Sequence, residues 1–266
     1  MLRPQCDAAT TKVNTINHVR NQGLCIPPAD PRRLLGALLK CDGYHTDMSD
    51  GFHPPLEEYL EAIHELEEEG VDVIQARLAE RLGHSAPSVS EMIRRLRTDG
   101  YLAPEGRTLA LTGKGRARAE SVVRKHRLAE RLLTDVIGLE WHKAHIEACR
   151  WEHVISDEVE ALLVPLLGNP TTCPHGNPIP GTDAPELDLI ALRDVPTGRR
   201  IRLERITEQV EIDFDALTYL NDHGFVPGTK AEVMTRAPDG TITLDLGPRT
   251  IALGPGLSEQ LYVTAV

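Results

Sequence analysis

Two stretches of the chain carry side chains that can bind a transition-metal ion. In the first, His126 and Glu130 stand four residues apart, a spacing that places both on one face of a helix. The second stretch holds four such side chains at positions i, i+4, i+7 and i+8: His145, Cys149, Glu152 and His153. On a single helix these intervals span an arc of roughly 100°. Imidazole, thiolate and carboxylate groups on facing helices suit Fe(II), Mn(II), Co(II), Ni(II) or Zn(II).

Each of these pairs alone has a more ordinary explanation. A His–Glu pair at this spacing is more often a surface salt bridge, and a cysteine on a helix is usually a small core residue. Six groups on two adjoining helices make that explanation improbable, so we predict a metal site. A metallohydrolase that uses His126, Glu130 and His145 stays open on the residues alone, although no HExxH signature accompanies them. A metal sensor that acts through a protein partner also stays open.

The cysteines give no sign of a disulfide framework. The chain has five, an odd number without a CxxC pair, which is typical of a cytoplasmic protein with reduced thiols. A cysteine that matters is therefore expected to act as a ligand or a nucleophile. The sequence has no apolar stretch long enough to cross a membrane.

Three helices and a hairpin are expected before the ligand stretches. Apolar residues recur at helical spacing over Leu56–Gly70, Ile74–Leu82 and Pro87–Thr98. Ser85 can cap the third helix, and residues Tyr101–Leu111 are typical of a short β-hairpin. This order is that of a winged helix-turn-helix, although a generic three-helix bundle would give the same pattern.

The distribution of charge favours the DNA-binding interpretation. The whole chain carries a formal charge of −11, which by itself argues against a nucleic-acid partner. Between Arg94 and Arg124, however, eight basic residues stand against three acidic ones. This basic segment covers the predicted recognition helix and wing, which are the parts that would meet DNA.

Longer helices are expected over Lys114–Ile137 and Trp141–Leu167, the second with a bend near Pro165. Six of the 19 prolines then fall between Pro165 and Pro185, which predicts an extended linker that either is an inert spacer or docks on the last domain. The C-terminal part predicts a helix near Asp213–Asp222 and a small barrel of five strands: Arg199–Ile206, Lys230–Thr235, Thr241–Leu246, Arg249–Leu253 and Leu261–Ala265.

The first 53 residues lack sustained periodicity and are rich in proline. We expect a loosely structured leader with a short helix over Arg32–Lys40. Met48 stands just before the periodic residues, so translation from Met48 and a genuine leader are two open alternatives.

Three motifs resemble the diphtheria-toxin-repressor and iron-dependent-regulator family. They are VRKHRLAERLL at 123–133, EACRWEHV at 147–154 and GNPIPG at 176–181. The resemblance runs from Leu56 to the C-terminus, about four-fifths of the chain. It implies a homodimeric metal-dependent repressor with an α+β fold, which binds double-stranded operator DNA as one or two dimers and controls metal-homeostasis genes. The implied parts are a winged-helix domain (54–121), a helical dimerisation and metal-binding domain (122–168), a proline-rich linker (169–186) and an SH3-like β-barrel (187–266), after a leader (1–53).

The resemblance also implies two metal sites in each subunit. Site one would use His126, Glu130, His145, Glu208 and Glu211, where Glu211 replaces a Gln that is frequent in the family. Site two would use Glu58, Glu61, Cys149, Glu152 and His153. An anion can sit beside site one in the family, where Arg127 and Asn177 match, although Cys173 replaces the usual Ser.

Site two is a hybrid of two branches of the family. Iron-responsive members have Met where this chain has Glu58, and a carboxylate there favours the harder Mn(II). Manganese-responsive members tend to have Glu where this chain has Cys149, and a thiolate there favours Fe(II) or Co(II). The implied corepressor is Mn(II) or Fe(II), with Mn(II) slightly favoured, and Co(II), Ni(II) or Zn(II) could bind in vitro.

DNA contacts are expected from the third helix and the wing. The residues are Ser85, Pro87, Ser88, Ser90, Glu91, Arg95 and Arg107, with the two arginines directed at phosphates. Glu91 stands where the family often has Gln. Because a carboxylate accepts from cytosine N4 but cannot donate to adenine or thymine, the operator is expected to differ from the usual palindrome.

Overall fold

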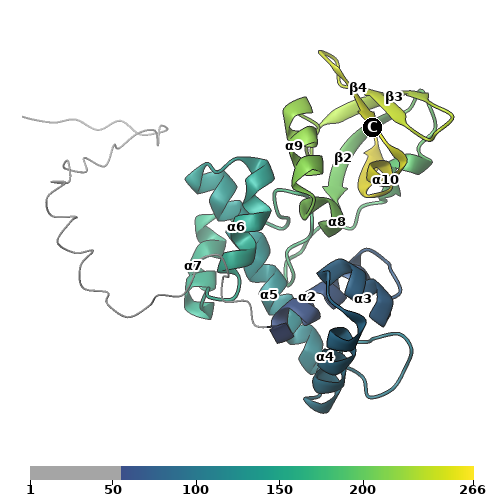
Figure 1. The fold of residues 1–266 in the computed structure, drawn as a ribbon. Helices are drawn as coiled ribbons and strands as arrows, with labels where there is room; N and C mark the ends of the chain where they lie inside the picture. The colour runs from purple at the N-terminus through teal and green to yellow at the C-terminus, as the bar shows by residue number, and fades with distance from the viewer. Residues whose placement is uncertain (1–54) are drawn as a thin grey trace, which may run out of the picture. The chain divides into compact units, whose positions relative to one another are not determined.

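The computed structural model describes residues 55–266 (Figure 1). The predicted leader, its short helix over Arg32–Lys40 and the alternative start at Met48 lie outside the described residues. No helix among residues 55–266 is long and apolar enough to cross a membrane.

The first three helices are α2 (Pro55–Glu68), α3 (Gln75–Leu82) and α4 (Ala86–Thr98), close to the predicted ranges. They share one apolar core, to which α2 contributes Tyr59, Leu60 and Ile63 and α4 contributes Val89, Ile93 and Leu96. Gly83 ends α3 with φ 64°, and the Ser85 hydroxyl accepts a hydrogen bond from the Ser88 amide at the start of α4. The tight turn between α3 and α4 therefore follows from a glycine and a capping serine.

The predicted hairpin is reduced to a single antiparallel bridge between Leu102 and Leu111. The Ala103 amide also donates to the Ala110 carbonyl at 2.9 Å, but the Leu109 amide donates to the Val73 carbonyl at 2.7 Å. The second arm of the wing is thus hydrogen-bonded to the loop after α2, and the two arms do not form a continuous pair of strands.

The helical region departs from the prediction in its second half. Helix α5 (Gly113–Arg131) continues as a π-helical turn, η1 (Leu132–Ile137), over the expected range. The single helix expected over Trp141–Leu167 is wrong, because the chain forms a short turn, η2 (Trp141–Lys143), then α6 (Ala144–Trp151) and α7 (Asp157–Leu166). The break comes from Ser156, whose hydroxyl accepts from the Val159 amide at 3.3 Å and starts a new helix, and it precedes the expected bend at Pro165.

The C-terminal region is an antiparallel sheet in the order β1-β6-β2-β3-β4-β5. The strands are β1 (Ile190–Ala191), β2 (Arg200–Ile206), β3 (Lys230–Arg236), β4 (Ile242–Asp245), β5 (Thr250–Leu253) and β6 (Leu261–Ala265). Helix α9 (Phe214–His223) is as expected, whereas β1, the 3-10 turn η3 (Leu192–Asp194) and the short helices α8 (Glu208–Glu211) and α10 (Pro255–Glu259) were missed. Leu203, Val233 and Leu244 lie in the core of this region.

The proline-rich segment between α7 and β1 is packed against its neighbours. Thr172 and Pro178 form an antiparallel bridge around a turn, and the Ile206 amide of β2 donates to the His175 carbonyl at 3.1 Å. From the helical side, the Trp141 indole donates to the Pro174 carbonyl at 3.0 Å. Of the two predicted alternatives, an inert spacer or docking on the last domain, docking describes this part of the segment.

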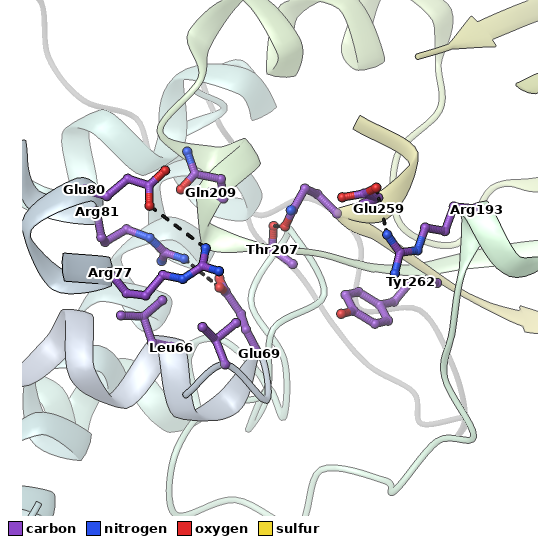
Figure 2. Close-up of a pocket in the computed structure, with 13 residues that line it drawn as sticks. Leu66, Glu69, Arg77, Glu80, Arg81, Arg193, Thr207, Gln209, Glu259 and Tyr262 are labelled. Carbon is purple, nitrogen blue, oxygen red and sulfur yellow. Dashed lines mark hydrogen bonds and ion pairs between the residues drawn. The ribbon is translucent and has the colours of Figure 1, made fainter. Parts of the chain in front are cut away.

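A cavity of about 330 Å³ opens between α3 and the sheet region (Figure 2). Its arginines are paired with acids: Arg81 contacts Glu69 at 2.6 Å, and Arg193 contacts Glu259 at 2.7 Å. Because these charges satisfy one another, the cavity does not present a set of converging ligand atoms.

Candidate metal centre and nucleic-acid interface

A second cavity, of about 220 Å³, contains most of the predicted metal ligands. Its possible ligands come from α2, α5, α6 with its C-terminal end, and α8, and α3 adds Arg81 and Leu82 to the wall. These helices are labelled in Figure 1. The possible ligands that line it are Glu58, Glu61, Glu65, His126, His145, Cys149, Glu152 and Glu208. Residues up to 150 positions apart in the sequence therefore meet at one place.

The five residues predicted for site one lie together, and we call them the first cluster. His145 Nδ1 lies 3.1 Å from Glu208 Oε1, 3.5 Å from Glu211 Oε2 and 3.7 Å from Glu130 Oε1. His126 Nε2 lies 3.3 Å from the same oxygen of Glu130. All five side chains are buried, and three of them, His126, His145 and Glu208, line the cavity.

The one-turn helix α8 supplies two members of the first cluster. It begins after Thr207, whose hydroxyl donates to Gln260 Oε1 at 2.7 Å and whose amide donates to the Gln260 carbonyl at 3.0 Å. Positions i and i+3 of a helix share a face, so Glu208 and Glu211 both point toward α6. A turn this short has no periodicity to detect in the sequence.

The residues predicted for site two are brought together in part. Glu61, His126 and Glu152 have ligand atoms within 4.8 Å of one another. Cys149 Sγ lies 3.5 Å from His145 Nε2, so the thiol lies beside the first cluster. Glu58, which is half-buried, lines the same cavity.

His126 connects the first cluster to the site-two residues. Its Nε2 faces Glu130, whereas its Nδ1 lies 2.5 Å from Glu152 Oε2. The other oxygen of Glu152 lies 3.0 Å from His153 Nε2. One imidazole thus stands between the carboxylates of both predicted sites.

Several buried atoms of the first cluster have no hydrogen-bond partner among the described residues. They are both oxygens of Glu130, Oε2 of Glu211, Nε2 of His126 and Nδ1 of His145. A buried polar atom without a partner costs about 1–3 kcal/mol, and a divalent cation would satisfy all of them with the oxygen and nitrogen donors that first-row ions take. The donor set therefore fits a metal ion.

The electrostatics of the cavity also fit a cation. Burial, with Glu152 and Glu65 nearby, raises the pKa of Glu61 well above its usual value, and burial with Glu211 does the same for Glu208. Burial opposes ionisation of the Cys149 thiol, but His145 and His126 lower its pKa to about 7. The cavity concentrates carboxylates that repel one another unless a positive charge lies between them.

His175 and Cys173 lie beside Glu130 and were not predicted as ligands from the sequence. Both are buried, and their ligand atoms lie within 4.8 Å of each other and of Glu130. The available signal was the Cys-Pro-His sequence at 173–175, which the surrounding prolines led us to interpret as linker.

Glu57, also missed, fixes the orientation of His153. Its Oε2 lies 2.7 Å from His153 Nδ1, and its Oε1 accepts from Arg118. A carboxylate on the far nitrogen of a ligating histidine orients the ring and raises its basicity.

We expect Glu57→Gln to weaken metal binding about 10- to 100-fold while the fold is retained. Isothermal titration with Mn(II) and circular dichroism would measure the two effects. Glu67→Gln is the matched control, because Glu67 also pairs with an arginine of α5, Arg116 at 2.8 Å, but does not contact a predicted ligand. Equal affinities for both variants would contradict the orienting role.

The two residues predicted to hold an anion are engaged with protein groups. The Arg127 guanidinium contacts Glu68 Oε2 at 2.6 Å and donates to the Pro178 carbonyl. Asn177 Nδ2 donates to Glu211 Oε1. An anion would have to compete with these partners.

The residues predicted to contact DNA lie on one helix and the wing. Ser85, Pro87, Ser88, Ser90, Glu91, Arg95 and Arg107 are all exposed. Apolar positions of the same helix, α4, face the core, so the recognition face is set by the amphipathic pattern. Glu91 pairs with Arg94 at 2.5 Å, and Ser90 Oγ donates to Gln75 Oε1 at 3.1 Å.

The basic segment is smaller than the sequence suggested. Arg116, Arg118 and Arg124 pair with Glu67, Glu57 and Glu160 of other helices. Arg94, Arg95 and Arg107 are exposed, but Arg94 pairs with Glu91 at 2.5 Å and Arg95 with Asp99 at 3.7 Å.

The fold and these two surfaces define a winged-helix protein with a buried metal-ligand cluster. Three regions match family descriptions: 52–108 the iron-dependent repressor N-terminal DNA-binding domain, 112–181 the iron-dependent repressor metal-binding and dimerisation domain, and 190–265 the FeoA domain. The chain is 49% identical over 223 residues to the iron-dependent repressor IdeR of Mycobacterium tuberculosis, covering 79% of this chain and 96% of that protein. It is 43% identical over 219 residues to the diphtheria toxin repressor of Corynebacterium diphtheriae, covering 78% and 95%.

Solved structures agree with these matches. A manganese-dependent transcriptional repressor in complex with manganese superposes with a TM-score of 0.70 at 32% identity, covering 79% of this chain and all of that one. ScaR with bound Zn²⁺ superposes with a TM-score of 0.67 at 28% identity, covering 80% and 100%. The chain therefore belongs to the iron-dependent repressor family, whose members are DNA-binding transcriptional repressors and not enzymes. The predicted resemblance and fold class are confirmed, and the metallohydrolase alternative is set aside.

Proposed function

We propose that this protein is a repressor whose DNA binding is switched on by Mn(II) or Fe(II) held in the cavity between α2, α5, α6 and α8. The observation that carries the proposal is the set of buried ligand atoms without hydrogen-bond partners, contributed by elements that are distant in the sequence. The named relatives support both ions: IdeR is iron-dependent, and the solved repressor is manganese-dependent. Its targets would be metal-homeostasis genes, and it would act in the cytoplasm.

Two sites in each subunit are proposed from the predicted residues. Site one would comprise His126, Glu130, His145, Glu208 and Glu211, and the short distances between their ligand atoms support this set. Site two comprises Glu58, Glu61, Cys149, Glu152 and His153, of which the two α2 carboxylates line the cavity opposite α6. A bound divalent ion would supply positive charge between these acids. The proposed domain boundaries remain 54–121, 122–168, 169–186 and 187–266.

The link between metal and DNA runs through α2. One face of α2 carries Glu57, Glu58 and Glu61 toward the ligand cavity, and another face carries Leu60 and Ile63 into the core shared with α4. A bound divalent ion would relieve the repulsion between the α2 carboxylates and Glu152, and it would thereby hold α2 against α5 and α6. Because α4 shares the core of α2, its orientation is fixed at the same time.

Gel shift on the DNA upstream of the gene for this protein tests the proposed function. We expect retardation with Mn(II) or Fe(II), reversal by EDTA, and loss of the shift in Cys149→Ala and Glu58→Ala variants that keep their circular dichroism. Retained metal-dependent retardation in both variants would contradict the role of site two. A protein that takes up metal but retards no DNA would instead act through a protein partner.

The dimer interface is proposed from exposed apolar side chains of the helical region. Leu162 and Leu166 of α7 are 67% and 62% exposed, and Val136 and Ile137 of η1 are 56% and 57% exposed. Large apolar side chains grouped on one region are typical of a protein–protein interface. The family description that matches 112–181 includes dimerisation.

We expect Leu162→Glu to raise the dissociation constant of the dimer about 100-fold or more, because a buried unpaired charge is costly in an interface core. Sedimentation velocity over a concentration series would measure it. Leu187→Glu is the control, since Leu187 is also exposed, at 45%, but lies outside the helical region. Dimers of equal stability in both variants would place the interface elsewhere.

A further inference from the structure

Helix α3 contributes a permanent positive charge to the wall of the ligand cavity. Arg81 is the one arginine or lysine among the described residues that line this cavity. The remaining titratable side chains of that lining are carboxylates, two imidazoles and one thiol. The Arg81 side chain is 7% exposed, so salt and water screen its charge little. An ion that enters the cavity therefore meets a fixed positive charge as well as the carboxylates that attract it.

Arg81 is placed between two carboxylates, one on α2 and one just after its end. Its Nη2 donates a hydrogen bond to Glu69 Oε2 at 2.6 Å, and its Nη1 lies 3.7 Å from Glu65 Oε2. Nη1 is buried and has no hydrogen-bond partner among the described residues. Figure 2 shows the guanidinium of Arg81 directed at Glu69. The side chain is thus anchored at Glu69 and extends toward Glu65 a donor that has no acceptor.

Glu65 belongs to the ligand cavity, whereas Glu69 does not. Glu65 lines that cavity, and Glu69 lines the neighbouring cavity between α3 and the sheet region. Burial, with Glu65 among the nearby acids, raises the pKa of Glu61 and that of Glu208, which are predicted ligands of different sites. The charge of Glu65 therefore acts on both sites, and so does the cation that pairs with it.

We propose that Arg81 is a built-in competitor of the metal ion and sets the metal concentration at which the cavity fills. In the metal-free cavity its guanidinium offsets part of the charge of Glu65. A divalent ion is attracted by the same carboxylates, and two cations that are close together at a buried place repel each other. The role of Arg81 rests on the proposed function, because it concerns the filling of the same cavity.

Two substitutions shift this competition in opposite directions. Arg81→Met removes the charge and keeps an unbranched apolar stem, so we expect Mn(II) to bind on the order of tenfold more tightly. Glu69→Gln removes the anchor that holds the guanidinium away from Glu65. Arg81 then pairs fully with Glu65, and we expect Mn(II) to bind several-fold more weakly. A residue that served only packing would not give tighter binding when it is replaced.

Isothermal titration of the full-length chain with Mn(II) measures both effects. The titrations are made at pH 8, above the value of about 7 to which burial raises the pKa of Glu65. Arg77→Met is the control for the loss of charge on α3, because the Arg77 side chain is 59% exposed and does not line the ligand cavity. Glu67→Gln is the control for the loss of an acid, because Glu67 also pairs with an arginine, Arg116 at 2.8 Å, and lies outside that lining. Both controls should bind Mn(II) as the unchanged protein does.

Unchanged or weaker Mn(II) binding by Arg81→Met with an unchanged circular dichroism spectrum would overturn the proposal. Loss of one partner of a buried ion pair can prevent folding. If Arg81→Met does not fold, Glu69→Gln is decisive, and an affinity equal to that of Glu67→Gln contradicts the role of Arg81.

The titrations contain no DNA, which separates this role from the proposed function. Equal affinities in all four variants would remove the competition by Arg81 and leave the metal-switched repressor standing. The expected shifts in affinity, together with a gel shift that shows no retardation, would leave the competition standing and remove the switch. An unchanged protein that takes up no Mn(II) would contradict both.

Discussion

A His126→Gln protein is expected to lose metal-activated DNA binding. Of the imidazoles in the described part of the chain, His126 is the one that faces Glu130 with Nε2 and Glu152 with Nδ1, so its replacement weakens both proposed sites together. Loss of a group that only orients a ligand costs 10- to 100-fold in metal affinity, and a shared ligand should contribute at least as much. We expect the metal concentration for half-maximal DNA binding to rise about 100-fold or more, measured by fluorescence anisotropy of labelled operator.

His223→Gln is the matched control for this experiment. His223 ends α9, and its Nδ1 bonds the Tyr219 carbonyl of its own helix at 2.8 Å, so the same chemical change occurs at a residue that does not line the ligand cavity. Its metal response should equal that of the unchanged protein. If His126→Gln keeps the same half-maximal metal concentration, then the histidine is a structural counter-ion to Glu130 and Glu152 and not a shared ligand.

The switch that this experiment probes needs a sizeable free energy. Moving a two-state protein from 1:99 to 99:1 takes about 5.5 kcal/mol of differential binding. Metal binding that draws ligands from α2 on one side and α6 on the other can contribute to that difference, because the two helices are far apart in the sequence and α2 is joined to α4 through their common core.

The sequence predicted those parts of the fold that repeat over several turns. Helices α2, α3, α4 and α5 follow from apolar periodicity and from capping signals such as Ser85, and the longer strands follow from alternation. The break of the helix at Ser156 was missed because a serine is tolerated within a helix and its capping contact is visible only in the structure. Glu152 and His153 thus lie beyond α6, not on its continuous face.

The candidate site was predicted where ligands lie on long helices and was incomplete elsewhere. Two pairs of ligand-type residues stand four positions apart, which is visible in the sequence: His126 with Glu130, and His145 with Cys149. His175 reaches the same oxygens from a turn whose position depends on tertiary contacts with Arg131, Trp141 and β2. Local sequence carries no information on such contacts, so a histidine among prolines was indistinguishable from linker.

The same turn gives the second large effect that we expect. Gly176 has φ 92°, and a Cβ built there would lie 1.9 Å from the Glu204 carbonyl oxygen and 2.9 Å from Arg205 Cα. Both are backbone atoms of β2, which cannot move aside as a flexible side chain would. In Gly176→Ala the left-handed backbone costs about 1–2 kcal/mol, and the forced contact costs about 1–3 kcal/mol more.

Gly168→Ala separates these two contributions. Gly168 also has a positive φ, of 77°, but a Cβ there would meet no atom within 4 Å. In urea unfolding of the metal-free protein, we expect the free energy of unfolding of Gly168→Ala to fall by roughly 1–2 kcal/mol, the cost of the left-handed backbone alone. For Gly176→Ala we expect a fall of about 3 kcal/mol or more.

A local measurement distinguishes displacement of the turn from a general loss of stability. The Ile206 amide donates to the His175 carbonyl, so its hydrogen exchange should accelerate in Gly176→Ala and stay slow in Gly168→Ala. Asn177, one residue further along, then loses its hydrogen bond to Glu211, and we expect the metal affinity to fall as a result. Slow exchange at Ile206 together with equal stability losses in the two variants would mean that β2 accommodates the added methyl group, and that the turn does not depend on glycine for its place beside the ligands.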